Sequence, residues 1–247
     1  MDLNRFSRSE ILIGKIGLEK LQKSSVIVFG LGGVGSYAAE ALCRGGVGKL
    51  TIVDFDDVSE SNINRQLHAL EATIGKSKTE LMAERMALIN PEAEIIPIRE
   101  FYSPDTSDFL LAGKFDYVLD AIDHFTNKVY LIKSCINKGL PVISSMGAAM
   151  KLDPTLIRVS DISETSKCRM ARSMRKLLRK EGIESGVKVV YSLEEFPGFT
   201  NGTPPGSVTE LPDGRGEWSR RVTLGSMSVV PPIFGLTMAG VVINDLL

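Results

Sequence analysis

The sequence is poor in several residue types that often carry chemistry. Its 247 residues include only three cysteines, two histidines and one tryptophan. The cysteines are too few and too scattered for a disulfide framework or for the paired CxxC motifs of a zinc ribbon: Cys43, Cys135 and Cys168. Lys and Arg (29) nearly balance Asp and Glu (30), and the net charge of −1 gives no global signature of nucleic-acid or membrane binding. Any such partner must be bound by a local patch.

Long apolar runs are also missing. The most apolar segment, from Pro231 to Leu247, has 17 residues and begins with two prolines. A bilayer needs roughly 20 apolar residues, so this segment predicts a buried helix and no membrane partner. The chain begins MDLNRFSRSE, without a secretory leader, and the expected location is the cytosol. With 43% hydrophobic and 24% charged residues, the composition is that of a globular protein and excludes a disordered or fibrous chain.

Strand-like and helix-like segments alternate over the first 150 residues. Short apolar runs predict buried strands over 26–29, 49–54, 94–98, 117–120 and 141–144. Amphipathic stretches predict helices over 5–23, 34–45, 76–90, 105–112 and 125–138. This alternation predicts an α/β fold, a doubly wound, mostly parallel, Rossmann-like sheet.

The pattern changes after about residue 148. A hairpin or mixed strand set is expected around 157–159, followed by a basic helix over 165–181. Residues 192–226 are rich in Pro and Gly and show no periodicity. We expect a long mobile loop there, because such stretches are usually disordered or form a lid over a site.

A glycine-rich turn predicts a nucleotide site. Gly30-Leu31-Gly32-Gly33-Val34-Gly35 fits GxGxxG directly between a predicted strand and a predicted helix. Such glycines let the backbone turn tightly and approach phosphates at a helix N-terminus. Asp54 ends the next strand, where a carboxylate can bind ribose hydroxyls.

The following loop distinguishes ATP from a dinucleotide. Asn62, Arg65 and Gln66 lie in SNINRQ, and Lys78 closes GKSK at the opening of a helix. Cationic donors of this kind can neutralise charge that builds on the β and γ phosphates. They favour a triphosphate over a nicotinamide cofactor.

Two sets of motifs resemble one enzyme superfamily. The first set consists of GLGGVGSYAAEALCRGGVGKLTIVDFDDVSESNINRQ, IGKSK and LDAID. It is similar to the ubiquitin-activating-enzyme-like superfamily, which includes ThiF, MoeB and HesA and adenylates carboxylates with ATP. The second set consists of KCRMARSMRKLLRKEGI, VVYSLEEFP and GSMSVVPPIFGLTMAGVVINDL. It resembles one branch of that superfamily, the tRNA threonylcarbamoyladenosine dehydratases, so that the resemblance spans nearly the whole chain.

The resemblance implies a role for each matching residue. Gly30, Gly32, Gly33 and Gly35 would line the phosphates, and Asp54 would hold the ribose. The triphosphate and the leaving pyrophosphate would be bound by four side chains: Asn62, Arg65, Gln66 and Lys78. Asp123 in LDAIDH would help to bind Mg²⁺, although His124 stands where family members often have Asn or Thr. Arg8 would enter the active site of a partner subunit, which implies a homodimer.

The implied organisation is a single adenylating-enzyme domain over 1–247. It has an ATP-binding part over 1–150 and a substrate-binding extension over 151–247. The substrate would be tRNA carrying threonylcarbamoyladenosine. ATP would adenylate its threonyl carboxylate, and the neighbouring ureido group would then close onto the activated carbonyl. Because the closure is intramolecular, no protein nucleophile is needed.

Three other functions are weighed against this one. An activator of a ubiquitin-like or sulfur-carrier protein usually holds zinc with paired CxxC motifs, which this chain lacks. A non-catalytic ATP-sensing scaffold would have little use for Arg65, Lys78 and Asp123 together. A nicotinamide oxidoreductase is disfavoured by the cationic donors. The sequence leaves open whether a sulfur-transfer protein is a further partner.

A basic helix is expected to provide the local patch for tRNA, and the alternative is an ordinary solvated basic face. Seven of the 14 residues from Lys167 to Lys180 are basic and none is acidic. Apolar residues recur at helical spacing toward the core. The opposite face is expected to contact tRNA phosphates through four side chains: Arg172, Arg175, Lys176 and Arg179. Cys168, at the start of this helix, is interpreted as a small apolar residue rather than a nucleophile.

Overall fold

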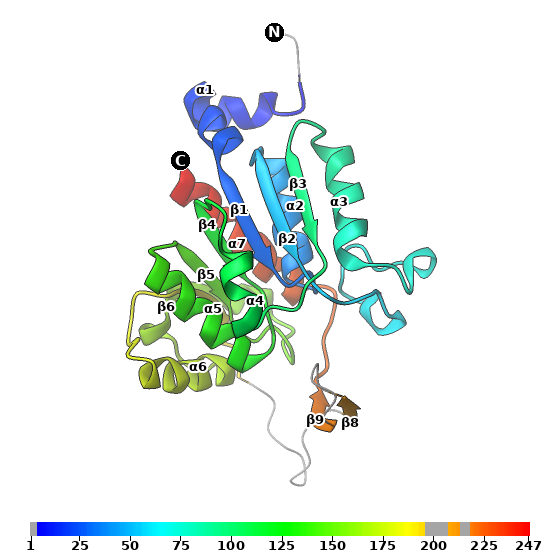
Figure 1. The fold of residues 1–247 in the computed structure, drawn as a ribbon, viewed down its shortest axis with the longest axis vertical. Helices are drawn as coiled ribbons and strands as arrows, with labels where there is room; N and C mark the ends of the chain where they lie inside the picture. The colour runs from blue at the N-terminus through cyan, green and yellow to red at the C-terminus, as the bar shows by residue number, and fades with distance from the viewer. Residues whose placement is uncertain (1–3, 196–206, 213–217) are drawn as a thin grey trace.

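The computed structural model describes residues 4–195, 207–212 and 218–247. Seven strands form one sheet in the order β3-β2-β1-β4-β5-β7-β6 (Figure 1). They are β1 (Ser25–Phe29), β2 (Lys49–Val53), β3 (Glu94–Ile98), β4 (Tyr117–Asp120), β5 (Val142–Ser145), β6 (Ile157–Asp161) and β7 (Lys188–Ser192). Neighbouring strands are parallel except β6, which pairs antiparallel with β7. The predicted doubly wound, mostly parallel α/β fold is confirmed.

Helices cover both faces of this sheet. On one face, α2 (Gly35–Gly45), α3 (Lys78–Ile89) and α7 (Val230–Leu246) pack their apolar residues against β1, β2 and β4. On the other face lie α4 (Pro104–Leu110), α5 (Phe125–Lys138) and α6 (Arg169–Lys180). Successive residues of the central strands enter opposite cores: Val26 and Val28 enter the first, Ile27 and Phe29 the second. The central strands are therefore apolar throughout, as expected for a parallel sheet buried on both faces.

The C-terminal part extends the same sheet. The strand expected at 157–159 is β6, and it pairs with a strand that the sequence analysis did not predict, β7. The basic helix is shorter than expected, since a 3-10 turn occupies Ile162–Glu164 and α6 begins only at Arg169. Within the expected loop at 192–226, β8 (Ser207–Pro212) and β9 (Trp218–Thr223) form an antiparallel pair. The long loop expected over 192–226 thus includes two short paired strands among its described residues.

Each edge strand of the seven-stranded sheet carries a residue that removes or occupies a backbone hydrogen-bonding group on its outer side. Pro97, which has no N–H, lies in edge strand β3 opposite Ile52. In the other edge strand, Arg158 Nη1 donates to the carbonyl oxygens of Thr155 and Ile157, each at 2.8 Å. These two residues give each edge an interrupted hydrogen-bonding pattern.

The N-terminal helix α1 (Ser7–Lys23) precedes β1 and lies at the amino ends of the strands (Figure 1). Gly14 breaks it with φ of 73°. Leu18 and Leu21 are buried, whereas Ile11, Leu12 and Ile16 are 76%, 85% and 75% exposed. The helix therefore presents an apolar face that the rest of the described chain leaves uncovered.

The apolar tail is helix α7, as predicted, and its packing against α2 buries Phe234, Met238 and Val242. None of the helices in the described part of the chain is long and apolar enough to cross a membrane.

Candidate active site

The candidate residues gather at the carboxyl ends of β1, β2 and β4. Gly30 directly follows β1, Asp54 follows β2, and Asp123 lies three residues beyond the end of β4. From β1 the chain winds outward to β2 and β3 and then crosses to β4 on the other side of β1. Ligands of open α/β sheets bind at such a switch point, outside the carboxyl ends of the strands.

The glycines of the turn serve different purposes. Gly30 has φ of +85°, and a Cβ there would lie 2.8 Å from the carbonyl oxygen of Ala121. A Cβ on Gly35 would lie 1.8 Å from the carbonyl oxygen of Gly30. These two positions require glycine for packing, whether or not a ligand is bound. A Cβ on Gly32 would meet only Gln66 Nε2, at 3.9 Å, so this is the glycine that opens the backbone toward a ligand.

Helix α2 begins directly after this turn and has the properties of an anion site. No side chain caps its N-terminus, and its first turn contains no acidic residue. The first amides of a helix lack partners within the helix, and the helix dipole favours negative charge near them. Gly33, before this helix, is enclosed by two side chains: a Cβ there would lie 3.1 Å from Arg65 Cγ and 3.1 Å from Pro231 Cβ. Arg65 therefore lies beside the turn.

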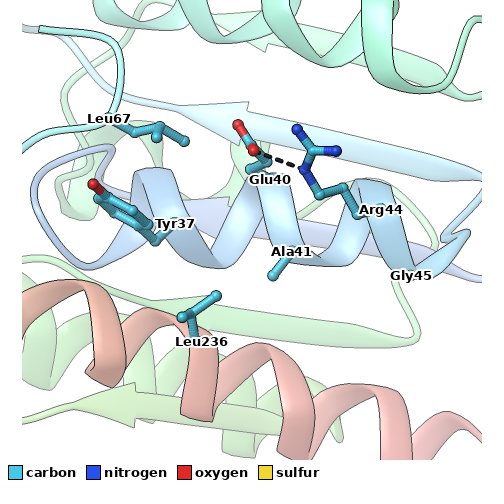
Figure 2. A pocket seen from close by; sticks show the side chains of 7 residues that line it. All are labelled: Tyr37, Glu40, Ala41, Arg44, Gly45, Leu67 and Leu236. Atoms are coloured by element: carbon cyan, nitrogen blue, oxygen red, sulfur yellow. Dashed lines mark hydrogen bonds and ion pairs between the residues drawn. The ribbon is translucent and has the colours of Figure 1, made fainter.

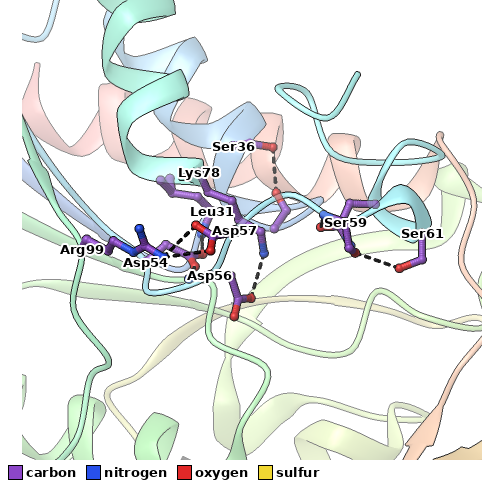
Figure 3. A network of polar contacts seen from close by, with 11 residues as sticks. Leu31, Ser36, Asp54, Asp56, Asp57, Ser59, Ser61, Lys78 and Arg99 are labelled. Carbon is purple, nitrogen blue, oxygen red and sulfur yellow. Dashed lines mark hydrogen bonds and ion pairs between the residues drawn. The ribbon is translucent and has the colours of Figure 1, made fainter. Parts of the chain in front are cut away.

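Asp54 holds the glycine turn in place (Figure 3). Its Oδ2 accepts a hydrogen bond of 2.5 Å from the amide of Leu31, and its Oδ1 accepts one of 2.9 Å from the amide of Asp56. Burial raises the pKa of the Asp54 carboxyl, against the opposing effects of Lys78 and of these amides. A carboxylate oxygen can accept more than one hydrogen bond, so the role expected at the ribose is compatible with this structural one.

Lys78 is the first residue of α3, and its ammonium lies at the site (Figure 3). Its Nζ donates to Asp56 Oδ2 at 2.8 Å. The Lys78 side chain is 5% exposed, while that of Asp56 is 47% exposed. A buried lysine paired with an accessible carboxylate can exchange that partner for a phosphate.

Arg65, Asn62 and Gln66 come from the loop that follows β2. Arg65 Nη1 donates to the carbonyl oxygen of Ser61 and to Asn64 Oδ1, each at 2.9 Å. Asn62 is buried, and its Oδ1 accepts from the amide of Ser59 at 3.1 Å. That bond makes Asn62 a residue that shapes the loop. Gln66 is buried beside Gly32, and its Oε1 has no hydrogen-bond partner in the part of the chain that the structure describes.

Asp123 faces the same space from the β4–α5 turn. Asp123 is exposed. Burial lowers the pKa of Arg65, and the negative charge of Asp123 opposes this effect, so the two charges lie near each other. Among the described residues, no three His, Cys, Asp or Glu side chains cluster as a complete metal cage. Mg²⁺ does not require one, since it commonly takes one or two carboxylates, several waters and substrate phosphates. The single Asp123 carboxylate therefore fits a magnesium ion whose other ligands are waters and the phosphates of a nucleotide.

Other candidate residues lie away from this group. Arg8 is exposed at the start of α1, at the amino ends of the strands and so opposite the glycine turn. On α6, Arg172, Lys176 and Arg179 are exposed. Arg175 is only half-exposed, and its guanidinium donates to the carbonyl oxygen of Thr165 at 2.8 Å. Arg175 thus anchors the start of α6, a role that the charge pattern alone did not distinguish from that of its neighbours.

The sequence analysis missed a buried histidine in the β2–α3 connection. His68 is 4% exposed, and neither ring nitrogen has a hydrogen-bond partner among the described residues. Burial, assisted by the charge of Lys78, lowers the pKa of His68 to about 4. No signal in the sequence revealed this, because a lone histidine in a loop is ordinarily solvated.

A hollow of about 340 Å³ lies elsewhere, between α2 and α7 (Figure 2). Tyr37 and Ala41 of α2 and Leu236 of α7 line it, and the Glu40–Arg44 ion pair lies at one side. Apolar side chains dominate this hollow, and it lacks exposed backbone amides at a helix start. It is therefore a poorer nucleotide site than the glycine turn.

Comparison with known proteins agrees with this geometry. The model of the ThiF family matches residues 6–247. A tRNA threonylcarbamoyladenosine dehydratase of Bacillus subtilis (strain 168) is 46% identical over 245 residues, which are 99% of this chain and 95% of that protein. A molybdopterin-synthase adenylyltransferase of Salmonella typhimurium is 38% identical over 154 residues, 62% of this chain and 61% of the relative.

A solved structure extends the likeness to three dimensions. The crystal structure of Escherichia coli tRNA N6-threonylcarbamoyladenosine dehydratase, TcdA, in complex with ATP superposes with a TM-score of 0.84 at 32% identity. The match covers 98% of this chain and 93% of that chain. Family model, sequence identity and fold agree over nearly the full length, and the chain therefore belongs to the ThiF family, within its branch of tRNA threonylcarbamoyladenosine dehydratases.

Proposed function

We propose that this protein uses ATP to dehydrate threonylcarbamoyladenosine in tRNA to its cyclic form. The observation that carries the proposal is the set of charges around one glycine turn. Arg65 packs beside Gly33. The charge of Lys78 favours the ionised form of Asp54, and the charge of Asp123 favours the charged form of Arg65. A nicotinamide enzyme has no need of this set, whereas phosphoryl chemistry needs cations where negative charge develops. The E. coli relative with the same fold has been solved with ATP and with AMP.

The first step is adenylation of the threonyl carboxylate. A carboxylate oxygen attacks the α-phosphorus of ATP, the bond to the β-phosphate oxygen breaks, and pyrophosphate leaves. Lys78 and Arg65 stabilise the charge that builds on this leaving group, and Gly32 lets the backbone approach the phosphates. Asp123 would hold Mg²⁺, which supplies further charge neutralisation when bound.

The second step closes the ring. The ureido group attacks the activated carbonyl and loses a proton, and AMP departs with one oxygen of the former carboxylate. No thiol is needed, and the three cysteines are all buried: Cys43, Cys135 and Cys168. Cys168 Sγ instead accepts the amide of Ala171 and caps α6. A sulfur-transfer protein partner, which the family resemblance allows, would have to act without these thiols.

A homodimer completes the proposed active site. Arg8 lies at the opposite end of its own sheet from the glycine turn, so it can reach a site of this kind only in a second subunit. The exposed Ile11, Leu12 and Ile16 give the same helix an apolar face suited to docking. Mixing Arg8→Ala protein with Lys78→Ala protein tests this. Mixed dimers should regain up to half of their sites, whereas no regain of activity would contradict action in trans.

The tRNA would bind across α6. Arg172, Lys176 and Arg179 are exposed at helical spacing on one face, where phosphate contacts provide affinity rather than sequence choice. This assigns substrate binding to residues 151–247 and ATP binding to residues 1–150. We place the enzyme in the cytosol on the basis of its proposed tRNA substrate.

Mass spectrometry of tRNA nucleosides tests the reaction directly. The protein is incubated with ATP, Mg²⁺ and tRNA that carries threonylcarbamoyladenosine. Loss of one water from the nucleoside, with AMP and pyrophosphate formed in step, is the expected result. No mass change, but pyrophosphate exchange upon addition of a diglycine-tailed carrier protein, would instead support a protein activator. Matches to molybdopterin-synthase adenylyltransferases, which cover about two thirds of this chain, favour that alternative.

A further inference from the structure

A fully buried ion pair lies beneath the turn that carries Asp123. Lys128 Nζ donates to Asp120 Oδ2 at 2.7 Å, and both side chains are 0% exposed. The Ser144 hydroxyl donates to the same Oδ2 at 2.6 Å. The carboxylate is thus held from β5 by Ser144 and from α5 by Lys128, while Asp120 itself ends β4.

These contacts fix both ends of the β4–α5 turn, residues 121–124. At its start, Asp120 Oδ1 accepts from the amide of Ile122 at 3.1 Å, and the amide of Ala121 donates to the carbonyl oxygen of Phe29 at 2.8 Å. At its end, Lys128 lies in the first turn of α5 and reaches back to the strand. Asp123 lies in the middle of this turn and cannot shift far while both ends are held.

The ion pair is unusual as a means of stabilisation. Burial lowers the pKa of Lys128, and only the opposing effects of Asp120 and Asp123 favour its charged form. Removing two charges from water costs several kcal/mol per ion, so that a buried pair often stabilises no more than apolar residues of similar volume. Its direct link to the turn gives it a different consequence, which is a fixed backbone geometry under Asp123.

We propose that Lys128 is a positioning residue: through its bond to Asp120 it holds the β4–α5 turn so that the Asp123 carboxylate is aimed at the metal bound with ATP. This inference rests on the proposed function, because it takes Asp123 as the metal ligand. Lys128 is fully buried, and the bond of its ammonium to Asp120 gives it a route to the turn.

Metal binding tests this role without measuring turnover. Mn²⁺ is titrated into the protein with a non-hydrolysable ATP analogue and followed by electron paramagnetic resonance. Ser144→Ala removes one hydrogen bond to Asp120 and keeps the ion pair. The double variant Asp120→Asn/Lys128→Met removes both charges, so that neither is left buried alone. We expect Mn²⁺ affinity to fall roughly threefold in the first and at least about tenfold in the second, as for residues that orient a metal ligand.

Tyr117→Phe is the matched control. Tyr117 starts the same strand β4, and its hydroxyl donates to Asp245 at 2.8 Å, at the far end from the turn. This variant should lose stability without a change in Mn²⁺ affinity. Hydrogen exchange gives a second readout. The Ile122 amide should exchange faster in Ser144→Ala and in the double variant, and at the normal rate in Tyr117→Phe.

The outcomes separate this inference from the proposed function. Unchanged Mn²⁺ affinity in both Ser144→Ala and the double variant would overturn the positioning role. If the double variant does not fold, unchanged affinity in Ser144→Ala is sufficient to overturn it. Asp123→Asn that binds Mn²⁺ as tightly as the unmodified protein would also overturn it. Unmodified protein that binds Mn²⁺ with the analogue but leaves tRNA unmodified would contradict the proposed reaction, and this role of Lys128 would stand.

Discussion

Two lysines at the starts of two helices make the same kind of bond in different surroundings. Lys78 opens α3 and pairs with Asp56 in the β2–α3 connection, and Lys128 lies in the first turn of α5 and pairs with Asp120 at the end of β4. The two N–O distances are nearly equal, 2.8 and 2.7 Å. The exposure of the carboxylate differs, at 47% for Asp56 and 0% for Asp120. Geometry alone would give both pairs the same role, whereas burial separates them.

The difference concerns what each lysine is free to do. Water can replace Lys78 at the Asp56 carboxylate, so that this ammonium can turn toward an incoming phosphate at small cost. Water cannot reach Asp120, and Lys128 must stay where it is. One pair is therefore suited to binding and the other to holding the backbone. The following predictions test that separation.

Replacing Lys128 should have the largest effect on folding. Lys128→Met leaves the Asp120 charge buried without a partner, which should lower the free energy of unfolding by about 3–5 kcal/mol. Urea unfolding followed by circular dichroism measures this change. The double variant Asp120→Asn/Lys128→Met should recover most of the loss. A single variant as stable as the unmodified protein would contradict a buried charge pair.

Replacing Lys78 should affect catalysis instead. Lys78→Met should reduce the rate of AMP formation roughly 10²–10³-fold, because one donor to the developing charge is lost. The free energy of unfolding should change by no more than about 1 kcal/mol, as is typical for a pair that includes an exposed carboxylate. Single-turnover kinetics and urea unfolding of one preparation give both values. Equal rates for variant and unmodified protein would remove Lys78 from the mechanism.

The β2–α3 connection should also make folding sensitive to acid through His68. The folded chain holds the pKa of His68 at about 4, below its ordinary value of 6.5, so that between these values the unfolded chain binds the extra proton. The free energy of unfolding should therefore fall as pH is lowered from about 6.5 to 4, by up to about 3 kcal/mol. Unfolding midpoints across this range measure the effect.

The chain contains one other histidine, which provides the control. His68→Leu should flatten the pH dependence over this range. His124→Asn keeps a side chain that can cap α5 and should retain the dependence. If both variants show the slope of the unmodified protein, the acid sensitivity arises at other groups.

Asp56→Asn should have the smallest effect. It removes the half-exposed partner of Lys78, but the nearby Asp54 carboxylate still interacts with the lysine charge, so the free energy of unfolding should change by no more than about 1 kcal/mol. ATP should bind at least as tightly as before, because Lys78 no longer has a competing anion. Isothermal titration with ATP measures this. Binding weakened more than about tenfold would indicate that Asp56 orients Lys78 rather than competing for it.

Most of the sheet was predictable because its signals are local. Strand β3 and helix α5 have the predicted bounds, since an apolar run or a helical period needs no knowledge of distant contacts. Strand β7 was missed although its run Val189-Val190-Tyr191 is apolar, because it stands next to a Pro- and Gly-rich segment that predicts a loop. The strands β8 and β9 lie within that segment.

The sequence names candidate residues for the site, and it does not predict their contacts. The glycine turn, Lys78 and Asp123 follow recognisable spacings. The burial of Lys128 does not, because a lysine one turn into a helix is ordinarily solvated and only the packing of β4, β5 and α5 encloses it. Arg175 illustrates the reverse case. Its charge predicted an exposed side chain, whereas in the structure its guanidinium donates a hydrogen bond to the carbonyl oxygen of Thr165.

The two interrupted sheet edges determine how copies of this protein can associate. An unbroken edge strand is a template on which another chain can add a strand, a route to domain swapping and aggregation. Here Pro97 lacks the amide that such a strand would need on β3, and the Arg158 side chain already occupies a carbonyl oxygen on β6. A strand from another copy would therefore find an interrupted row of donors and acceptors at either edge of the seven-stranded sheet.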